Sequence, residues 1–224
     1  MIPRTLEPEV MDTREEAVDY NSMDHSDVNR RFVDRFITAL DDAGLERSTL
    51  TLDVGTGTAL IPIELCRRGP EYRVTAIDLA GEMLKVAQDN IAEAQLADQI
   101  TIERVDAKQM PYTDSQFDAV MSNSIIHHIP EPETCFADII RVLRPGGLLF
   151  VRDLMRPDDG ETVEHIVQAY AGDENQHQQQ MFRDSLHAAL TLEEVRAMLK
   201  RFGLIEEWAQ QTTDRHWTIC GVML

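Results

Sequence analysis

Residues 52–59 read Leu52-Asp53-Val54-Gly55-Thr56-Gly57-Thr58-Ala59, and this stretch decides the fold. It lies between an apolar run at 50–54, which predicts a strand, and a helical pattern at 59–68. Glycine at such a junction lets the backbone turn tightly and lets a ligand approach it without a Cβ in the way. The stretch therefore predicts a ligand-binding strand–turn–helix unit.

The alternation of strand and helix continues beyond this stretch. Four more apolar runs predict strands at 73–77, 100–105, 117–122 and 148–152, and helical patterns at 81–96 and 133–143 lie between them. Alternation of this kind predicts a mostly parallel sheet covered by helices. Two late runs, at 204–209 and 216–223, are too close for a helical crossover and predict an antiparallel hairpin. We therefore expect an α/β fold with a Rossmann-like, doubly wound, mostly parallel seven-stranded sheet.

The pattern predicts one domain over residues 1–224. An N-terminal cap and helix are expected at 1–48, the helix starting at an Asp27 N-cap, followed by a ligand-binding core at 49–153 and a closing helix and hairpin at 191–224. Segments 1–26 and 154–190 lie outside the regular alternation. They are polar but carry isolated side chains that could cover a ligand, and we expect them to form a lid: Tyr20, Met23, Tyr170, Met181 and Phe182.

A carboxylate at the end of the second strand points to a nucleoside. Asp78 follows the glycine turn by about 20 residues, where an acidic side chain can accept hydrogen bonds from ribose hydroxyls. A dinucleotide fingerprint would place its third glycine at Leu60, which is too bulky for close backbone approach. A nicotinamide-dependent oxidoreductase is therefore the weaker alternative.

The spacing instead resembles the class I S-adenosylmethionine-dependent methyltransferases. Their acidic-x-G-x-G-x-G motif is matched by Asp53, Gly55 and Gly57, with Ala59 in the place of the third glycine. Further matches follow in order: Val105-Asp106-Ala107, Phe117 to Ser122, and Arg141-Val142-Leu143-Arg144-Pro145-Gly146-Gly147. The resemblance covers residues 49–153, and the closing hairpin fits it. It implies a small-molecule methyltransferase, with an inactive, methyltransferase-like binding module as a second alternative.

The resemblance also implies a cofactor and its contacts. The cofactor is S-adenosyl-L-methionine, the product is S-adenosyl-L-homocysteine, and the methyl group passes to the nucleophile by in-line displacement. Asp106 would reach the adenine amino group, Asn123 the methionine portion and Tyr20 the cofactor carboxylate. The full set of expected cofactor contacts is Tyr20, Asp53, Gly55, Thr56, Gly57, Asp78, Leu79, Met83, Asp106, Ala107 and Asn123.

Candidate acceptor-side residues follow the fourth and fifth strands, because ligands of open α/β sheets lie beyond the carboxyl ends of the strands. His127 or His128 could act as a base, since imidazole titrates near neutrality; alternatively the pair caps the next helix and packs the loop. Asp153 could hold a hydroxyl or cationic acceptor, or be a solvated strand end. The remaining histidines and the three cysteines are scattered, so no metal site is expected.

The amino-acid composition limits the classes of partner that we expect the protein to bind. Forty acidic against 21 basic residues give a net charge of −19, which opposes binding to nucleic acid. No apolar run is long enough to span a membrane, and the first residues lack the apolar stretch of a signal peptide. Three separated cysteines suggest reduced thiols and a cytoplasmic location. The sequence indicates neither the acceptor nor the oligomeric state.

We predict that Asp78→Ala weakens cofactor binding and leaves the fold intact. Loss of a charged hydrogen-bond acceptor should cost about 1.5–3 kcal/mol, or roughly ten- to hundredfold in affinity. Calorimetric titration with S-adenosylhomocysteine measures this change. An unchanged affinity would remove Asp78 from the cofactor site.

Overall fold

The computed structural model describes residues 2–10, 12–23 and 26–224. The chain divides into two compact units, each described by itself below. The glycine-turn unit comprises Val10–Asn123, Thr134–Val151 and Cys220–Leu224. The histidine unit comprises Met1–Glu9, Ser124–Glu133 and Arg152–Ile219. No helix among the described residues is long and apolar enough to cross a membrane.

A seven-stranded sheet runs through the fold, in the order β3-β2-β1-β4-β5-β7-β6. Strand β1 pairs in parallel with β2 and β4, and β2 pairs in parallel with β3, whereas β6 and β7 are antiparallel. The predicted mostly parallel sheet with an antiparallel end is confirmed. The strands are β1 (Leu50–Val54), β2 (Arg73–Asp78), β3 (Ile100–Arg104), β4 (Phe117–Asn123), β5 (Leu143–Leu154), β6 (Ala209–Gln211) and β7 (His216–Val222).

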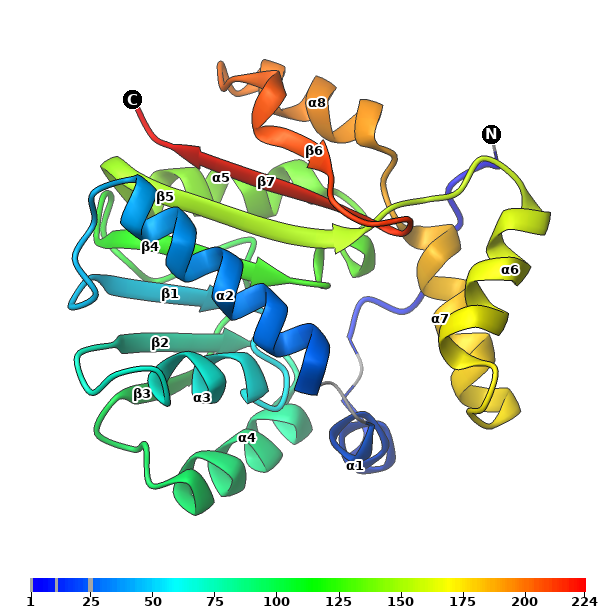
Figure 1. Cartoon of the computed structure of the whole chain (residues 1–224), viewed down its shortest axis with the longest axis horizontal. Helices are drawn as coiled ribbons and strands as arrows, with labels where there is room; N and C mark the ends of the chain where they lie inside the picture. The colour runs from blue at the N-terminus through cyan, green and yellow to red at the C-terminus, as the bar shows by residue number, and fades with distance from the viewer. Residues whose placement is uncertain (1, 11, 24–25) are drawn as a thin grey trace. The chain divides into compact units, whose positions relative to one another are not determined.

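Helices cover both faces of the sheet in the glycine-turn unit (Figure 1). On one face α2 (Ser26–Asp42), α3 (Leu60–Cys66) and α4 (Gly81–Ala94) share a core with side chains of β2, β4 and β5. The opposite face carries α5 (Pro132–Val142). At the centre of the shared core the rings of Phe32 and Phe36 meet the Phe150 ring edge to face, with centroids 5.1 and 5.7 Å apart.

The described residues of the histidine unit form three α-helices and two short 3₁₀-helices. These are η1 (Ile126–His128), α6 (Gly160–Ala171), α7 (Gln176–Ala188), α8 (Leu192–Arg201) and η2 (Glu206–Trp208). Helices α6 and α7 pack around Val163, Ile166, Val167 and Leu186, and Phe182 and Ile2 border this core. The Gln-rich tract at 176–180 is the first part of α7, begun by an Asn175 capping box.

Three sequence expectations differ from the structure. Segment 1–26, read as irregular, contains α1 (Arg14–Ser22), begun by a capping box between Thr13 and Glu16. Helix α2 starts at Ser26, before its predicted Asp27 cap. The strand predicted at 204–209 is instead η2 followed by β6 at Ala209, because its apolar residues 204, 205, 208 and 209 have helical spacing. Residues 1, 11, 24 and 25 of the expected lid lie outside the described residues.

The glycine turn contains three residues in the left-handed region. Gly55 has φ 76°, Gly57 has φ 54° and Ala59, directly before α3, has φ 61°. Ala59 thus precedes the helix and holds a conformation that costs a residue with a Cβ about 1–2 kcal/mol.

We therefore predict that Ala59→Gly stabilises the protein or leaves its stability unchanged. Relief of left-handed strain should offset the added freedom of glycine in the unfolded chain. The free energy of unfolding should therefore rise by about 0 to 1 kcal/mol. Urea denaturation measures it, and Ala87→Gly inside α4 is the matched control, expected to destabilise. A loss above about 1 kcal/mol for Ala59→Gly would contradict the assigned backbone conformation.

Candidate functional site

The candidate cofactor site lies at the carboxyl ends of β1, β2 and β3 in the glycine-turn unit. Parallel pairing brings Asp53, Asp78 and Asp106 to the same edge. One carboxylate oxygen of Asp78 accepts the Gly57 N–H at 2.8 Å, and the other accepts the Ala80 N–H at 2.9 Å. Asp78 thus holds the turn itself, so its replacement by alanine would also loosen the turn rather than leave the local fold untouched. A carboxylate retains further lone pairs for ribose hydroxyls.

Asp53 is a buried carboxylate with an unmet hydrogen-bonding need. Its side chain is 2% exposed, and its Oδ2 has no hydrogen-bond partner among the described residues. The hydroxyls of Thr56 and Thr58, in the same turn, are also buried and make no hydrogen bond within the described part of the chain. Burial raises the pKa of Asp53 to about 7. The carboxylate can accept hydrogen bonds from a polar, positively charged ligand that enters the turn, and the hydroxyls can donate to it or accept from it.

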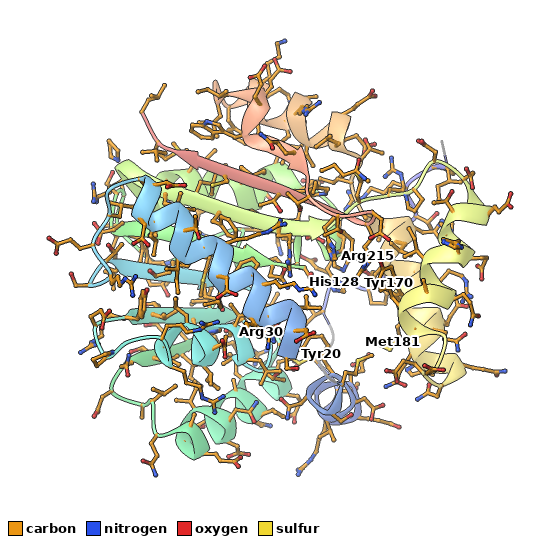
Figure 2. The ribbon with its side chains drawn as sticks, viewed as in Figure 1. Tyr20, Arg30, His128, Tyr170, Met181 and Arg215 are labelled. Atoms are coloured by element: carbon orange, nitrogen blue, oxygen red, sulfur yellow. The ribbon has the colours of Figure 1, made fainter. Side chains whose placement is uncertain are left out.

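Tyr20 covers the glycine turn, as expected from the sequence. A Cβ added to Gly57 would come to 3.8 Å from Cε1 of Tyr20, so the ring lies directly against the turn. Burial, followed by the nearby charges of Asp78 and Asp53, raises the pKa of the Tyr20 hydroxyl. The hydroxyl is therefore a hydrogen-bond donor at neutral pH. Figure 2 shows Tyr20 on α1, in the glycine-turn unit.

Sequence reasoning missed the residue that fixes α1 in place. The side-chain amide of Asn90, on α4, donates to the Thr58 carbonyl at 2.9 Å and to Oδ1 of Asn21 at 2.8 Å. One side chain thus joins α1, α4 and the glycine turn. Nothing in the residue pattern marks Asn90, because its partners lie 32 and 69 positions away.

The other expected cofactor residues lie in the same unit with different surroundings. Asp106 accepts the Lys108 N–H at 2.9 Å and pairs with its ammonium at 3.0 Å; although burial opposes this, these contacts lower the pKa of Asp106. Met83 is buried beside Ala17 and Ala80, beneath α1. The remaining three are half-buried: Leu79, Ala107 and Asn123, the last residue of β4.

A pocket of about 550 Å³ in this unit lies among α2, α3 and α4. Met23, Arg30, Leu60 and Asn90 are among its lining residues. None of the three carboxylates lines it. We therefore place the cofactor at the carboxylates and the glycine turn, and assign this pocket no ligand.

In the histidine unit, Asp153 and His127 form a buried pair. Nδ1 of His127 lies 2.5 Å from Oδ1 of Asp153, and the backbone N–H groups of Ile126 and His127 donate to Oδ2 at 2.5 and 3.2 Å. Asp153 is fully buried and His127 is 4% exposed. Burial alone would lower the pKa of His127, but the charges of Asp153 and Glu7 raise it. Burial likewise opposes ionisation of Asp153, yet His127 lowers the pKa of that carboxyl.

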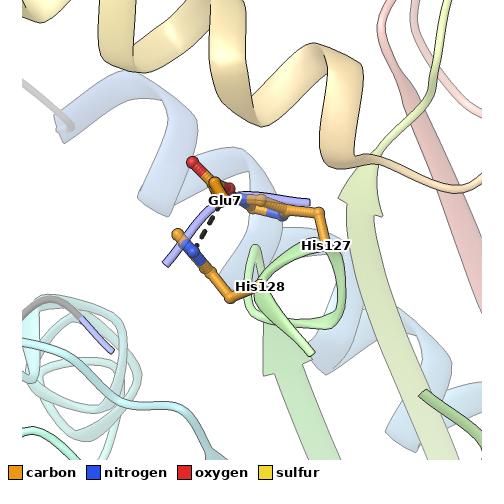
Figure 3. Close-up of side chains that lie close together, drawn as sticks. All are labelled: Glu7, His127 and His128. Carbon is orange, nitrogen blue, oxygen red and sulfur yellow. Dashed lines mark ion pairs between the residues drawn. The ribbon is translucent and has the colours of Figure 1, made fainter. Parts of the chain in front are cut away.

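Glu7 and His128 complete a cluster with His127 (Figure 3). Oε1 of Glu7 lies 3.2 Å from Nδ1 of His128 and 3.6 Å from Nε2 of His127. The two imidazole rings lie 4.2 Å apart between centroids. Burial, and then the neighbouring His127, lowers the pKa of His128 to about 3, so this ring is neutral. Burial raises the pKa of Glu7.

No motif or spacing in the sequence predicts that residues 2–7 lie beside the histidines. Arg4 anchors this segment by donating to four carbonyl oxygens, those of His127, Ile129, Pro130 and Ala188, at 2.6–3.2 Å. The Thr5 N–H donates to the His187 carbonyl at 3.0 Å. Such contacts join positions more than 120 residues apart, and no periodicity reveals them.

Two of the expected lid side chains are engaged within the histidine unit. The Arg215 guanidinium lies over the Tyr170 ring, 3.3 Å from its centroid (Figure 2), and the Tyr170 hydroxyl donates to Asp214 at 2.7 Å. Phe182 packs against the α6–α7 core. Segment 154–190 is therefore built as a helical pair, and its closure over a ligand stays a prediction.

Comparison with known proteins places these features in a family. A family model described as a methyltransferase domain matches residues 52–151. The malonyl-[acyl-carrier protein] O-methyltransferase of Geobacter sulfurreducens is 31% identical over 206 residues, which cover 89% of this chain and 72% of that protein. The 27-O-demethylrifamycin SV methyltransferase of Amycolatopsis mediterranei is 29% identical over 75% of this chain and 59% of its own length.

A solved structure has the same fold over nearly the whole length. It is a putative S-adenosyl-L-methionine-dependent methyltransferase of Methanococcus maripaludis, with a TM-score of 0.73. The match covers 98% of this chain and 96% of that one. At 20% sequence identity, this likeness concerns the fold alone.

We predict opposite effects of Asp53→Asn on stability and on binding. The folded-state pKa of about 7 lies above the ordinary 3.8, so the stability that protonated Asp53 contributes is lost as pH rises from about 4 through 7. Asparagine does not ionise and so avoids this loss. Between pH 4 and pH 8, the free energy of unfolding of the cofactor-free variant should therefore rise by on the order of 3 kcal/mol relative to that of wild type.

Cofactor binding should respond in the other direction. If the ionised carboxylate receives the ammonium group of the ligand, wild-type affinity for S-adenosylhomocysteine should rise about tenfold from pH 6 to pH 8. The affinity of Asp53→Asn should be weaker and nearly independent of pH. Thermal unfolding and calorimetry at the two pH values measure both effects. A wild-type affinity that is flat across this range would exclude Asp53 from the binding step.

Proposed function

Because the chain belongs to the S-adenosylmethionine-dependent methyltransferase family, we propose that it methylates an ionisable oxygen of a small molecule at the Asp153–His127 pair. The enzyme class and the cofactor follow from the family. The acceptor atom and the residues that serve it are the proposal. The buried pair of Asp153 and His127 is the observation that carries it.

The glycine-turn unit fits the cofactor. S-adenosylmethionine carries an ammonium group, a sulfonium group and ribose hydroxyls, and the unit offers the unpaired Oδ2 of Asp53 and the remaining lone pairs of Asp78. The Tyr20 hydroxyl is suited to donate to the cofactor carboxylate. When bound, the cofactor supplies an electrophilic methyl group. The residues of the turn bind and orient it, and Tyr20 shields it from water.

The acceptor-side residues follow directly from the end of β4. His127 is four residues beyond Asn123, a stretch that spans at most about 14 Å of chain. Ser124, in between, has φ 60°, an unusual conformation for serine that the Ser124 N–H bond to the Arg152 carbonyl helps to hold. Strained residues of this kind cluster at functional sites. His127 thus follows in the chain from the end of β4, and acceptors of open α/β enzymes bind beyond the carboxyl ends of the strands.

Asp153 determines which nitrogen of His127 is available to the methyl acceptor. Its carboxylate accepts the Nδ1–H, which favours the neutral tautomer that carries its lone pair on Nε2. Methyl transfer to a hydroxyl forms an O–C bond and breaks the C–S bond, whose electron pair goes to sulfur. The hydroxyl proton passes to the histidine cluster and then to solvent. The residues of this chain contribute by positioning the oxygen and drawing away its proton.

The relatives and the charge favour a small-molecule acceptor. Two of the similar proteins are named for methylation at oxygen, one on malonyl-[acyl-carrier protein] and one on a rifamycin, whereas four others are named as C-methyltransferases of quinone biosynthesis. A net charge of −19 disfavours a nucleic-acid acceptor. Three free cysteines, two of them buried, support the expected cytoplasmic location.

We predict that His127→Asn abolishes turnover while cofactor affinity stays within about twofold of wild type. Incubation with methyl-labelled S-adenosylmethionine and a small-molecule extract, followed by mass spectrometry, identifies the labelled product. The matched control is His165→Asn on α6, an exposed histidine that should leave turnover unchanged.

Three results bear on the proposal. A product labelled on oxygen, lost only in His127→Asn, supports it. A product labelled on carbon, nitrogen or sulfur contradicts the acceptor class. Full turnover by His127→Asn contradicts the role of the Asp153–His127 pair, even if the chain methylates oxygen.

A further inference from the structure

Three side-chain atoms converge within the histidine unit from two distant parts of the sequence. They are Nε2 of His127, Nδ1 of His128 and Oε1 of Glu7, and all lie within 4.8 Å of one another (Figure 3). The Glu7 oxygen lies 3.2 Å from one nitrogen and 3.6 Å from the other. Ligands about 2.1 Å from a common ion have separations near these values. The two separations measured from Oε1 of Glu7 are therefore those expected between ligands of one small cation.

Two of these residues are oriented by hydrogen bonds made through their second polar side-chain atom. His127 gives its Nδ1–H to Asp153, which leaves Nε2 directed toward Glu7. Oε2 of Glu7 accepts the Ser185 hydroxyl at 3.2 Å, which leaves Oε1 directed toward the histidines. Metal-binding histidines and carboxylates are characteristically oriented in this way by hydrogen bonds to their remaining atoms.

Two of the three converging atoms also lack a hydrogen-bond partner among the described residues. Oε1 of Glu7 and Nδ1 of His128 are buried and make no hydrogen bond to the described residues, although each is a strong polar group. Charge favours a cation as well. The carboxylates of Asp153 and Glu7 favour a positive charge at His127, and the guanidinium of Arg4 opposes one.

We propose that Glu7, His127 and His128 bind one divalent transition-metal ion. Two imidazoles and one carboxylate suit zinc, iron, cobalt or nickel rather than magnesium or calcium, which prefer oxygen alone. Three protein ligands leave coordination positions open. On the proposed function, an acceptor oxygen takes an open position. Coordination would lower the pKa of that oxygen and so ease the loss of its proton.

The sequence does not predict this site. It offers the adjacent histidines but places Glu7 120 positions away from His127, with no metal-ligand spacing between them. The site depends on the Arg4 anchor, which brings residues 2–7 to η1. The residue pattern therefore predicts no metal site.

The test is metal binding by the full chain, without cofactor or acceptor. Chelator-treated protein is titrated with Zn²⁺ in competition with a chromophoric chelator, and separately with Co²⁺, whose visible absorption reports its ligands. Glu7→Gln keeps the shape and the Ser185 contact but removes the charged ligand, and His128→Gln removes a nitrogen ligand. His165→Gln, exposed on α6, is the matched control for adventitious binding by surface histidines.

We expect one Zn²⁺ per chain in wild type and in His165→Gln. Glu7→Gln and His128→Gln should each weaken binding at least tenfold and lose the intense Co²⁺ absorption of a site with few ligands. Wild-type affinity no tighter than that of Glu7→Gln and His128→Gln overturns the proposal, as does an equal loss in His165→Gln. Because no turnover is measured, this result stands apart from the acceptor experiment, in which the proposed function can fail on its own.

Discussion

The segment Ile77–Asp78 ties the cofactor edge of the sheet together. The Ile77 carbonyl accepts the N–H groups of Gly55 and Thr56, both at 2.9 Å, and the Asp78 carboxylate accepts those of Gly57 and Ala80. The Asp78 carbonyl accepts the Val105 N–H at 3.0 Å. Two consecutive residues thus fix the glycine turn, the start of α4 and the exit from β3. The other contacts of the cofactor site, including Tyr20 against Gly57, depend on this arrangement.

Local chemistry explains why much of this arrangement could be predicted from the sequence. The bounds of β1 agree at both ends, and the glycine turn and Asp78 lie at the predicted sheet edge, because strand period, turn glycines and acidic strand ends are short-range signals. Helix α1 was missed although Thr13 and Glu16 form a capping box that was legible in the sequence. The polar composition of residues 14–22 outweighed that signal.

The histidine unit shows what short-range signals cannot supply. His127, His128 and Asp153 could be selected from their places after β4 and in β5, but their states could not. Asp153 is fully buried rather than a solvated strand end, and the two adjacent histidines have pKa values shifted in opposite directions. Burial lowers both pKa values, but His127 bonds to Asp153 and lies near Glu7, which approaches from a distant part of the chain, and these carboxylates raise its pKa. Tertiary contacts of this range leave no period or spacing to read.

The burial of Asp53 couples the release and uptake of a proton to cofactor exchange. A carboxyl group with a pKa of about 7 is half protonated in a neutral cell, so entry of a cationic ligand beside it expels a fraction of a proton into the medium. Departure of the ligand takes that fraction back. The heat of ligand entry then includes the ionisation heat of the surrounding buffer. Acidification would slow reloading of the enzyme after each turnover, even where the folded chain itself becomes more robust.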